Sequence, residues 1–130
     1  MGKTDYHIHP NYSIDAAPVT IKEYCTRAVE LQLEEICFTT HLEVDPVRGE
    51  FDNFVAVNGE KVSVWDLSWL DHYFADLAQA QEEFASVNLR VKVGLEVGYC
   101  PGQERAIERF LNNYPFDFVM GAIHCVNHMN

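Results

Sequence analysis

The chain has 130 residues, of which 48% are hydrophobic and 12% aromatic, so it can bury the core of one folded domain and is not a disordered segment. Its 20 acidic and 9 basic residues give a formal net charge of -11, which repels phosphate backbones and argues against nucleic acid as a partner. No apolar stretch approaches membrane-spanning length, and the four cysteines form no C-x-x-C pair. We therefore expect a cytoplasmic protein that has reduced thiols and no membrane contact.

The first predicted strand covers residues 5–9 and contains two histidines, His7 and His9. Because side chains alternate along a strand, both imidazoles and Asp5 share one face, and Tyr6 and Ile8 should point to apolar packing on the other. Two neighbouring neutral imidazoles are a potential metal site. A pair of solvated histidines near the start of a chain would look the same in the sequence.

The next segments alternate between helix and strand. Thr20 and Glu23 form a T-x-x-E capping box, which predicts a helix from there to about residue 33. A short β-prone run over residues 35–40 follows, with His41 at its end. Residues 44–64 are irregular, except that Asn-Gly at 58–59 between two Val-rich arms predicts a β-hairpin.

The second half of the chain repeats this alternation. Apolar residues at helical spacing predict helices over 66–85 and 101–112, and apolar runs predict strands over 89–97 and 116–124. Helices between consecutive strands imply a parallel sheet joined by crossovers, so the fold class is α/β with about four parallel strands and a hairpin insertion.

Four potential ligands, His9, His41, Glu96 and His124, stand at the ends of four different predicted strands. The carboxyl ends of parallel strands meet at one edge, where active sites of such folds lie. Each residue alone has an ordinary explanation, such as an ion pair, a core histidine or a loop residue. Together they favour a metal site, and a mixture of imidazole and carboxylate suits zinc, manganese or iron.

The motifs that carry these residues resemble those of the PHP (polymerase and histidinol phosphatase) superfamily. They are D-Y-H-I-H-P-N-Y-S-I-D (5–15), F-T-T-H-L-E (38–43), G-L-E-V-G (94–98) and G-A-I-H (121–124). The resemblance implies a distorted (β/α)₇ barrel with up to three divalent metals (Zn, Mn or Fe) at the strand ends. It also implies hydrolysis of small phosphomonoesters, of which histidinol phosphate is the best-known substrate.

The same resemblance implies six metal ligands in this chain: His7, His9, Asp15, His41, Glu96 and His124. Glu96 would bridge the ion held by the first two histidines to a second ion that His124 also binds. Asp15 and His41 would share a third. The nucleophile would be a hydroxide bridging two ions, held by His7, His9, Glu96 and His124, and Arg48 is a local candidate for binding the substrate phosphate.

Two departures from the family pattern stand out. Thr40 occupies a position where the family usually has the Asp that orients the following histidine. The chain also ends six residues after His124, whereas the family continues with further βα units that supply more ligands. We therefore expect residues 1–130 to be the N-terminal half of a PHP barrel, whose open sheet edges favour self-association.

Three functions are compatible with these observations. The leading hypothesis is a metal-dependent phosphoesterase of the histidinol phosphatase type, or the N-terminal half of one. The alternative is a non-catalytic, truncated domain that binds metal or serves in assembly. A PHP module of a DNA polymerase is disfavoured by the acidic composition and by the absence of polymerase sequence.

Overall fold

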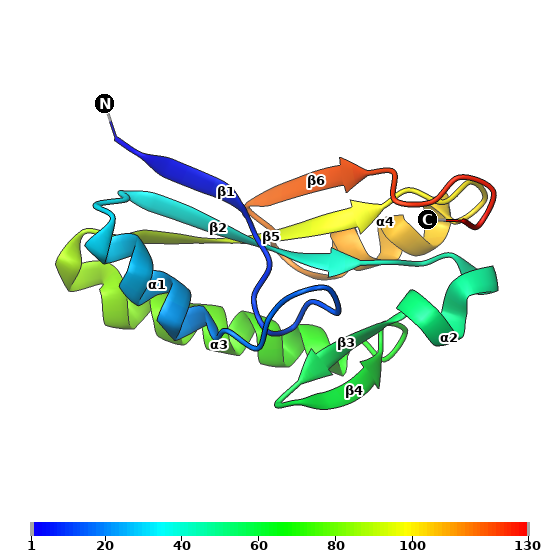
Figure 1. The fold of residues 1–130 in the computed structure, drawn as a ribbon, viewed down its shortest axis with the longest axis horizontal. Helices are drawn as coiled ribbons and strands as arrows, with labels where there is room; N and C mark the ends of the chain where they lie inside the picture. Colours follow the sequence, from blue (N-terminus) through cyan, green and yellow to red (C-terminus); the bar gives the residue numbers. More distant parts are fainter. Residues whose placement is uncertain (1, 130) are drawn as a thin grey trace.

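The computed structural model describes residues 2–129. Its main sheet has four parallel strands in the order β1-β2-β5-β6, namely β1 (Thr4–Ile8), β2 (Glu35–Leu42), β5 (Arg90–Gly98) and β6 (Phe118–Ala122). Three longer helices connect or follow these strands: α1 (Ile21–Glu30), α3 (Ser68–Phe84) and α4 (Glu104–Asn113). The strands form a curled half-barrel, and all four point the same way in Figure 1. The predicted α/β class with about four parallel strands is confirmed.

The irregular region after β2 holds the shorter elements. A 3₁₀ turn (Pro46–Arg48) leads into α2 (Gly49–Asp52), and the hairpin strands β3 (Phe54–Val57) and β4 (Glu60–Ser63) follow. Asn58 and Gly59 have φ values of 51° and 84°, as the tight hairpin turn requires. The predicted hairpin is therefore confirmed, and a second 3₁₀ turn (Ala85–Val87) closes α3.

Helices α1 and α3 lie on the same side of the sheet and pack against each other (Figure 1). Helix α1 begins where expected, because the capping box is complete: the Thr20 hydroxyl accepts from the Glu23 N–H, and the Glu23 carboxylate accepts from the Thr20 N–H. Apolar side chains fill the space between these helices and the sheet: Ile36, Phe38, Leu42, Trp69, Leu70, Tyr73, Leu77 and Leu95.

Tyr73 of α3 ties this core together. Its ring is fully buried, and its hydroxyl lies 3.0 Å from the carbonyl oxygens of both Phe38 in β2 and Gly94 in β5. The helix is thereby fixed across the two central strands. Those strands carry His41 and Glu96 at paired positions, so the core anchors the part of the sheet where the site lies.

Several local predictions differ from the structure, among them the end of β2, which lies at Leu42 instead of residue 40. Tyr6 and Ile8 do not share one apolar face: Ile8 joins the core, while Tyr6 donates a hydrogen bond to Glu35 and packs on Phe118 with ring centroids 5.2 Å apart. An irregular register between Asp5 and Ile8 breaks the two-residue alternation of β1. In addition, α4 begins at Glu104 rather than 101, because a turn with φ of 84° at Gly102 precedes it.

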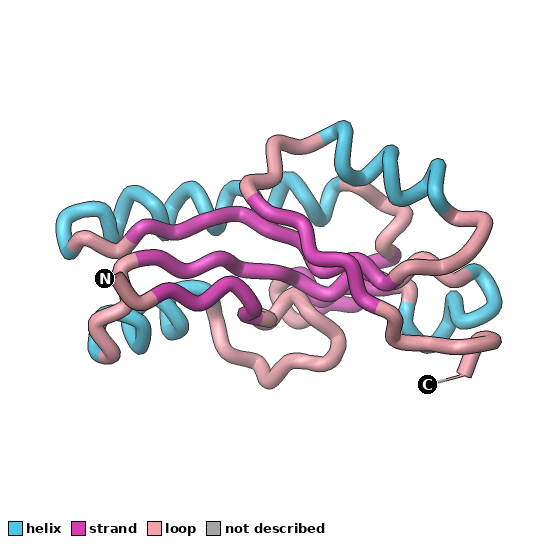
Figure 2. Tube along the Cα trace, turned by 90° about the horizontal axis from the view of Figure 1, so that it is seen from above, coloured by secondary structure: helices cyan, strands magenta, loops and turns pink. Residues whose placement is uncertain are grey.

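The molecule is longest along the direction of the strands (Figure 1). Figure 2, seen from above, shows the strands side by side, with the described start of the chain near their amino ends and its described end beyond their carboxyl ends. Among residues 2–129, no helix combines the length and the apolar character needed to cross a membrane.

Candidate metal centre

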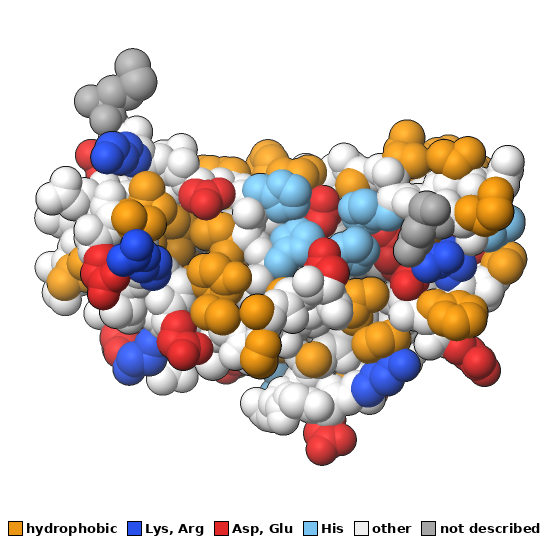
Figure 3. Space-filling model, viewed as in Figure 1, with side chains coloured by type: hydrophobic (Ala, Val, Ile, Leu, Met, Phe, Trp, Pro, Cys, Tyr) orange, Lys and Arg blue, Asp and Glu red, His pale blue; other side chains and the backbone are white. Residues whose placement is uncertain are grey.

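The carboxyl ends of the four parallel strands bring the predicted ligands together. His9 directly follows β1, His41 lies near the end of β2, Glu96 lies near the end of β5, and His124 follows β6 by two residues. In the space-filling view of Figure 3, histidines and carboxylates gather in the middle of one face, with apolar side chains beside them. Parallel strand order alone accounts for this meeting point, because neighbouring strands end at the same edge.

Glu96 is the centre of the cluster. Its side chain is only 5% exposed, and its two oxygens face four imidazoles. Oε2 lies 2.7 Å from Nε2 of His9 and 3.7 Å from Nδ1 of His41. Oε1 lies 3.3 Å from Nε2 of His7 and 3.5 Å from Nε2 of His124. One buried carboxylate of β5 is thus shared by histidines that lie in, or just after, the other three strands of the sheet.

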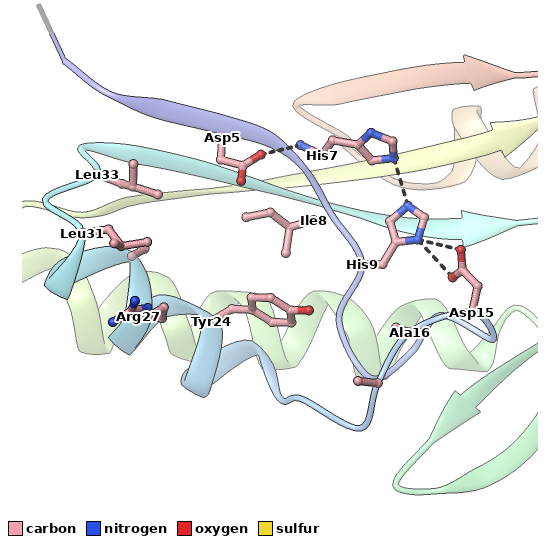
Figure 4. A pocket seen from close by; sticks show the side chains of 12 residues that line it. Asp5, His7, Ile8, His9, Asp15, Ala16, Tyr24, Arg27, Leu31 and Leu33 are labelled. Carbon is pink, nitrogen blue, oxygen red and sulfur yellow. Dashed lines mark hydrogen bonds and ion pairs between the residues drawn. The ribbon is translucent and has the colours of Figure 1, made fainter.

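His7, in β1, and His9, directly after it, lie side by side. Their Nε2 atoms are 3.2 Å apart, and the other ring nitrogen of His9 lies 3.0 Å from both carboxylate oxygens of Asp15 (Figure 4). Asp15 comes from the loop after β1, and its Oδ2 is also 3.3 Å from Nδ1 of His41. The loop after β1 therefore places a carboxylate beside His9 and His41.

The ligand atoms of the cluster lie close enough together to hold cations. Glu96 Oε2 and His41 Nδ1 are both buried and have no hydrogen-bond partner among residues 2–129, despite the short separations around them. Three overlapping groups place one donor atom per residue within 4.8 Å of the others: His7, His9 and Glu96; His9, Asp15 and His41; and His41, Glu43 and His124. Mixed imidazole and carboxylate donors suit zinc, manganese or iron.

The electrostatics of the cluster favour positive charge. Burial opposes the ionised form of Asp15, but its hydrogen bond with His9 and the nearby imidazoles lower the pKa of Asp15. Burial likewise opposes the charged form of His41, but the hydrogen bond with Glu43 and the neighbouring carboxylates raise the pKa of His41. The carboxylates therefore stabilise either a proton on the imidazole or a metal ion in its place.

Glu43 belongs to the cluster but was not among the predicted ligands. Its buried carboxylate lies 2.9 Å from Nε2 of His41 and also contacts Nδ1 of His124. The signal was present in the sequence: His41-x-Glu43 has the same two-residue spacing as His7-x-His9, so both side chains emerge on one face of the chain. The prediction ended the strand at residue 40, whereas β2 continues through Leu42.

The predicted phosphate ligand, Arg48, is engaged elsewhere. Its guanidinium forms an ion pair with Asp52 and donates a hydrogen bond of 3.2 Å to the carbonyl of His128. A phosphate would have to compete with this ion pair, and nothing in the structure places Arg48 among the four site imidazoles. Its role as a substrate ligand stays a prediction.

A groove of about 590 Å³ opens beside the cluster, between β1 and α1. His7, His9 and Asp15 stand at one end, and Figure 4 shows Tyr24 and Arg27 reaching it from α1. Its remaining walls are mostly apolar: Ile8, Ala16, Ala17, Ala28, Leu31 and Leu33. The cluster is thus open to a small molecule from this side.

Comparisons with known proteins show which proteins the chain resembles. The chain is 32% identical over 124 residues to a histidinol-phosphatase of Lactococcus lactis and 31% identical over 125 residues to a probable histidinol-phosphatase of Deinococcus radiodurans. Each match covers 95% of this chain, but only 40% and 42% of the two relatives. The chain therefore spans about two fifths of the length of these relatives.

A solved structure gives the same result in three dimensions. The crystal structure of the Lactococcus lactis histidinol phosphate phosphatase, complexed with zinc, L-histidinol and phosphate, matches with a TM-score of 0.74 and 30% identity. This match covers 97% of the present chain and 41% of that one. The family model described as "PHP domain" matches residues 5–130. The chain therefore belongs to the PHP domain family.

Proposed function

We propose that this chain is part of a metal-dependent phosphomonoesterase of the histidinol phosphatase type. The observation that carries the proposal is the convergence of four imidazoles on the buried Glu96 carboxylate, together with two buried ligand atoms that make no hydrogen bond among residues 2–129. Membership of the PHP domain family and the likeness to histidinol phosphatases support it.

Each of the six predicted ligands has a place in this proposal. His7, His9 and Glu96 would hold one divalent ion, and Glu96 would extend to a second ion bound by His124. Asp15 and His41 would hold a third. When bound, such ions supply Lewis acidity and make water a strong enough nucleophile to attack phosphorus at neutral pH. Zinc, manganese and iron all fit the donor set.

The groove between β1 and α1 is the proposed position of the substrate. A phosphate beside His7 and His9 would leave the organic part of the molecule along the apolar wall. Asp5 lines the groove, and the guanidinium of Arg27 on the opposite wall is paired with Glu30, so a carboxylate is available to a substrate carrying an amine. A small phosphorylated amine such as histidinol phosphate meets these requirements, and the acidic surface argues against nucleic acid.

The experiment measures metal content and turnover together. Purified protein is loaded with Mn²⁺ or Zn²⁺ and tested with histidinol phosphate and a panel of phosphomonoesters. We expect turnover that requires added metal, that disappears in His9→Ala, and that persists in the control His72→Ala, whose side chain is exposed on α3. Metal-independent hydrolysis, or hydrolysis that survives His9→Ala, would contradict the proposal.

A second candidate function rests on the two open edges of the sheet. Strands β1 and β6 are at the two ends of the strand order, and Val119 and Ile123 near β6 are exposed. The chain also spans only about two fifths of its relatives. A non-catalytic metal-binding or assembly domain would bind metal fully without turnover on the phosphomonoester panel. For either function we expect self-association through the open edges, seen as a dimer or larger by light scattering.

A further inference from the structure

The orientation of His41 and His124 requires a partner that the sequence pattern left unassigned. A metal-binding histidine needs one ring nitrogen free for the ion, and a hydrogen bond at the other nitrogen usually fixes which one that is. Thr40, the neighbour of His41, does not fill this role, because strand alternation places it on the opposite face of β2, where it is fully buried.

Glu43 makes the hydrogen bonds in question. Its Oε1 lies 2.9 Å from Nε2 of His41, and the same oxygen contacts Nδ1 of His124. The two imidazoles are stacked with centroids 4.3 Å apart, and the Glu43 side chain is only 7% exposed. A carboxylate oxygen accepts hydrogen bonds, so we assign a proton to each of the two ring nitrogens that face it.

These hydrogen bonds leave the other nitrogen of each ring on the metal side. Nδ1 of His41 lies 3.3 Å from Asp15 and 3.7 Å from Glu96, and Nε2 of His124 lies 3.5 Å from Glu96. Nδ1 of His41 is buried without a hydrogen-bond partner among residues 2–129. Lone pairs of both rings are thus directed toward the Glu96 side of the cluster.

Gly98 provides the space that Glu43 occupies. A Cβ added at this position, at the end of β5, would overlap both carboxylate oxygens of Glu43. Glycine is used where another group must approach the backbone closely, so the carboxylate position depends on the absence of a side chain here. Two separate strands, β2 and β5, therefore build the place for this carboxylate.

We propose that Glu43 is a positioning residue that fixes the tautomers of His41 and His124 for metal binding, and that Gly98 makes room for it. The inference rests on the metal-binding part of the proposed function but not on hydrolysis. The competing role for Glu43 is direct coordination in a group with His41 and His124. The two roles differ in the number of ions that remain after Glu43 is changed.

The test uses two variants, Glu43→Gln and Gly98→Ala, and one control, Glu108→Gln, whose side chain is exposed on α4. Nitrogen–proton correlation spectra of metal-free, ¹⁵N-histidine-labelled protein report the tautomer of each ring. At a pH high enough for both rings to be neutral, we expect Nε2–H for His41 and Nδ1–H for His124 in the parent protein and the control, and mixed tautomers in both variants.

Zinc affinity, measured by competition with a chelator, is the second readout. We expect the affinity to fall by about 10–100-fold in both variants, as for other residues that orient metal-binding histidines, with the number of bound ions unchanged. Loss of one equivalent of zinc in Glu43→Gln would make Glu43 a direct ligand and overturn the inference. Unchanged tautomers would also overturn it.

The use of two variants keeps the test informative if one of them does not fold. Gly98→Ala leaves Glu43 chemically intact and moves it, whereas Glu43→Gln keeps the size of the side chain and removes its charge. Circular dichroism must show that at least one variant is folded like the parent. Absence of phosphatase activity in the parent protein would count against the proposed function and leave the tautomers and the zinc affinity as independent results.

Discussion

Replacement of Glu96 by Gln should have opposite effects on the metal-free and the metal-loaded protein. Glu96 is buried, its Oε2 makes no hydrogen bond among residues 2–129, and the carboxylates of Asp15 and Glu43 approach His41, which also faces Glu96. Without a metal, this charge depends on the surrounding imidazoles alone for compensation. With a metal, the same charge is the shared ligand of the cluster. The substitution keeps the size of the side chain and removes the charge.

The magnitudes follow from these two roles. A buried polar group with incomplete hydrogen bonding costs roughly 1–3 kcal/mol, and more when it is charged, so replacing the Glu96 carboxylate by the neutral Gln amide should stabilise the metal-free protein by about 1–2 kcal/mol. Zinc at about 100 times its dissociation constant stabilises the parent protein by about 2.7 kcal/mol. If Glu96→Gln weakens binding about 100-fold, the same zinc concentration gives the variant only about 0.4 kcal/mol.

The order of stability should therefore reverse when zinc is added. Urea unfolding followed by circular dichroism, with and without zinc, measures the free energy of unfolding of both proteins. Without zinc we expect the variant to be the more stable protein, and with zinc the parent protein. Glu108→Gln, at an exposed position of α4, serves as the control and should follow the parent under both conditions.

Two outcomes would refute this reasoning. If Glu96→Gln destabilises the metal-free protein by more than about 1 kcal/mol, the carboxylate is well compensated without a metal, by protonated histidines for example. If zinc stabilises the variant as much as the parent protein, Glu96 is not a ligand, and the proposed arrangement of ions fails.

Three further predictions concern the fold that carries the site. Thr20→Ala removes the helix cap of α1 and should lower the free energy of unfolding by about 1 kcal/mol in urea titrations; no loss would mean that the cap is dispensable. Gly94→Ala should destabilise the protein by about 1–3 kcal/mol or more, because its Cβ would lie 2.8 Å from the Phe38 carbonyl oxygen. Gly121→Ala, where a Cβ would point into open space, should be tolerated. Equal changes in the melting temperature of the two variants would contradict this. Hydrogen bonds from Thr20 lower the pKa of Glu23, so the stability that Glu23 contributes is present above its ordinary pKa of 4.5 and is lost as pH falls through the lower folded value. Stability measured from pH 7 to pH 3 should therefore fall less in Glu23→Gln than in the parent protein, and parallel curves would argue against the shift.

Much of the architecture could be predicted because its signals are local. The capping box at Thr20 and the Asn58-Gly59 turn act through neighbours within four residues, so both appear in the structure as predicted. The alternation of helices and strands implied parallel pairing, and parallel pairing places strand ends at one edge. The sequence alone therefore predicts that His9, His41 and Glu96 lie close together.

Tertiary structure decided what depends on register and close approach. Glu43 joins the cluster because β2 extends two residues farther than its propensities indicated and pairs with β5 up to Val97. Tyr6 leaves the face of Ile8 because the pairing of β1 shifts between Asp5 and Ile8. The room for Glu43 depends on Gly98 of a neighbouring strand. Residue types and spacings by themselves determined which side chains could reach the carboxyl edge of the sheet. Only the packed sheet decided which of their atoms face each other, because the positions of these atoms depend on contacts between residues far apart in the chain.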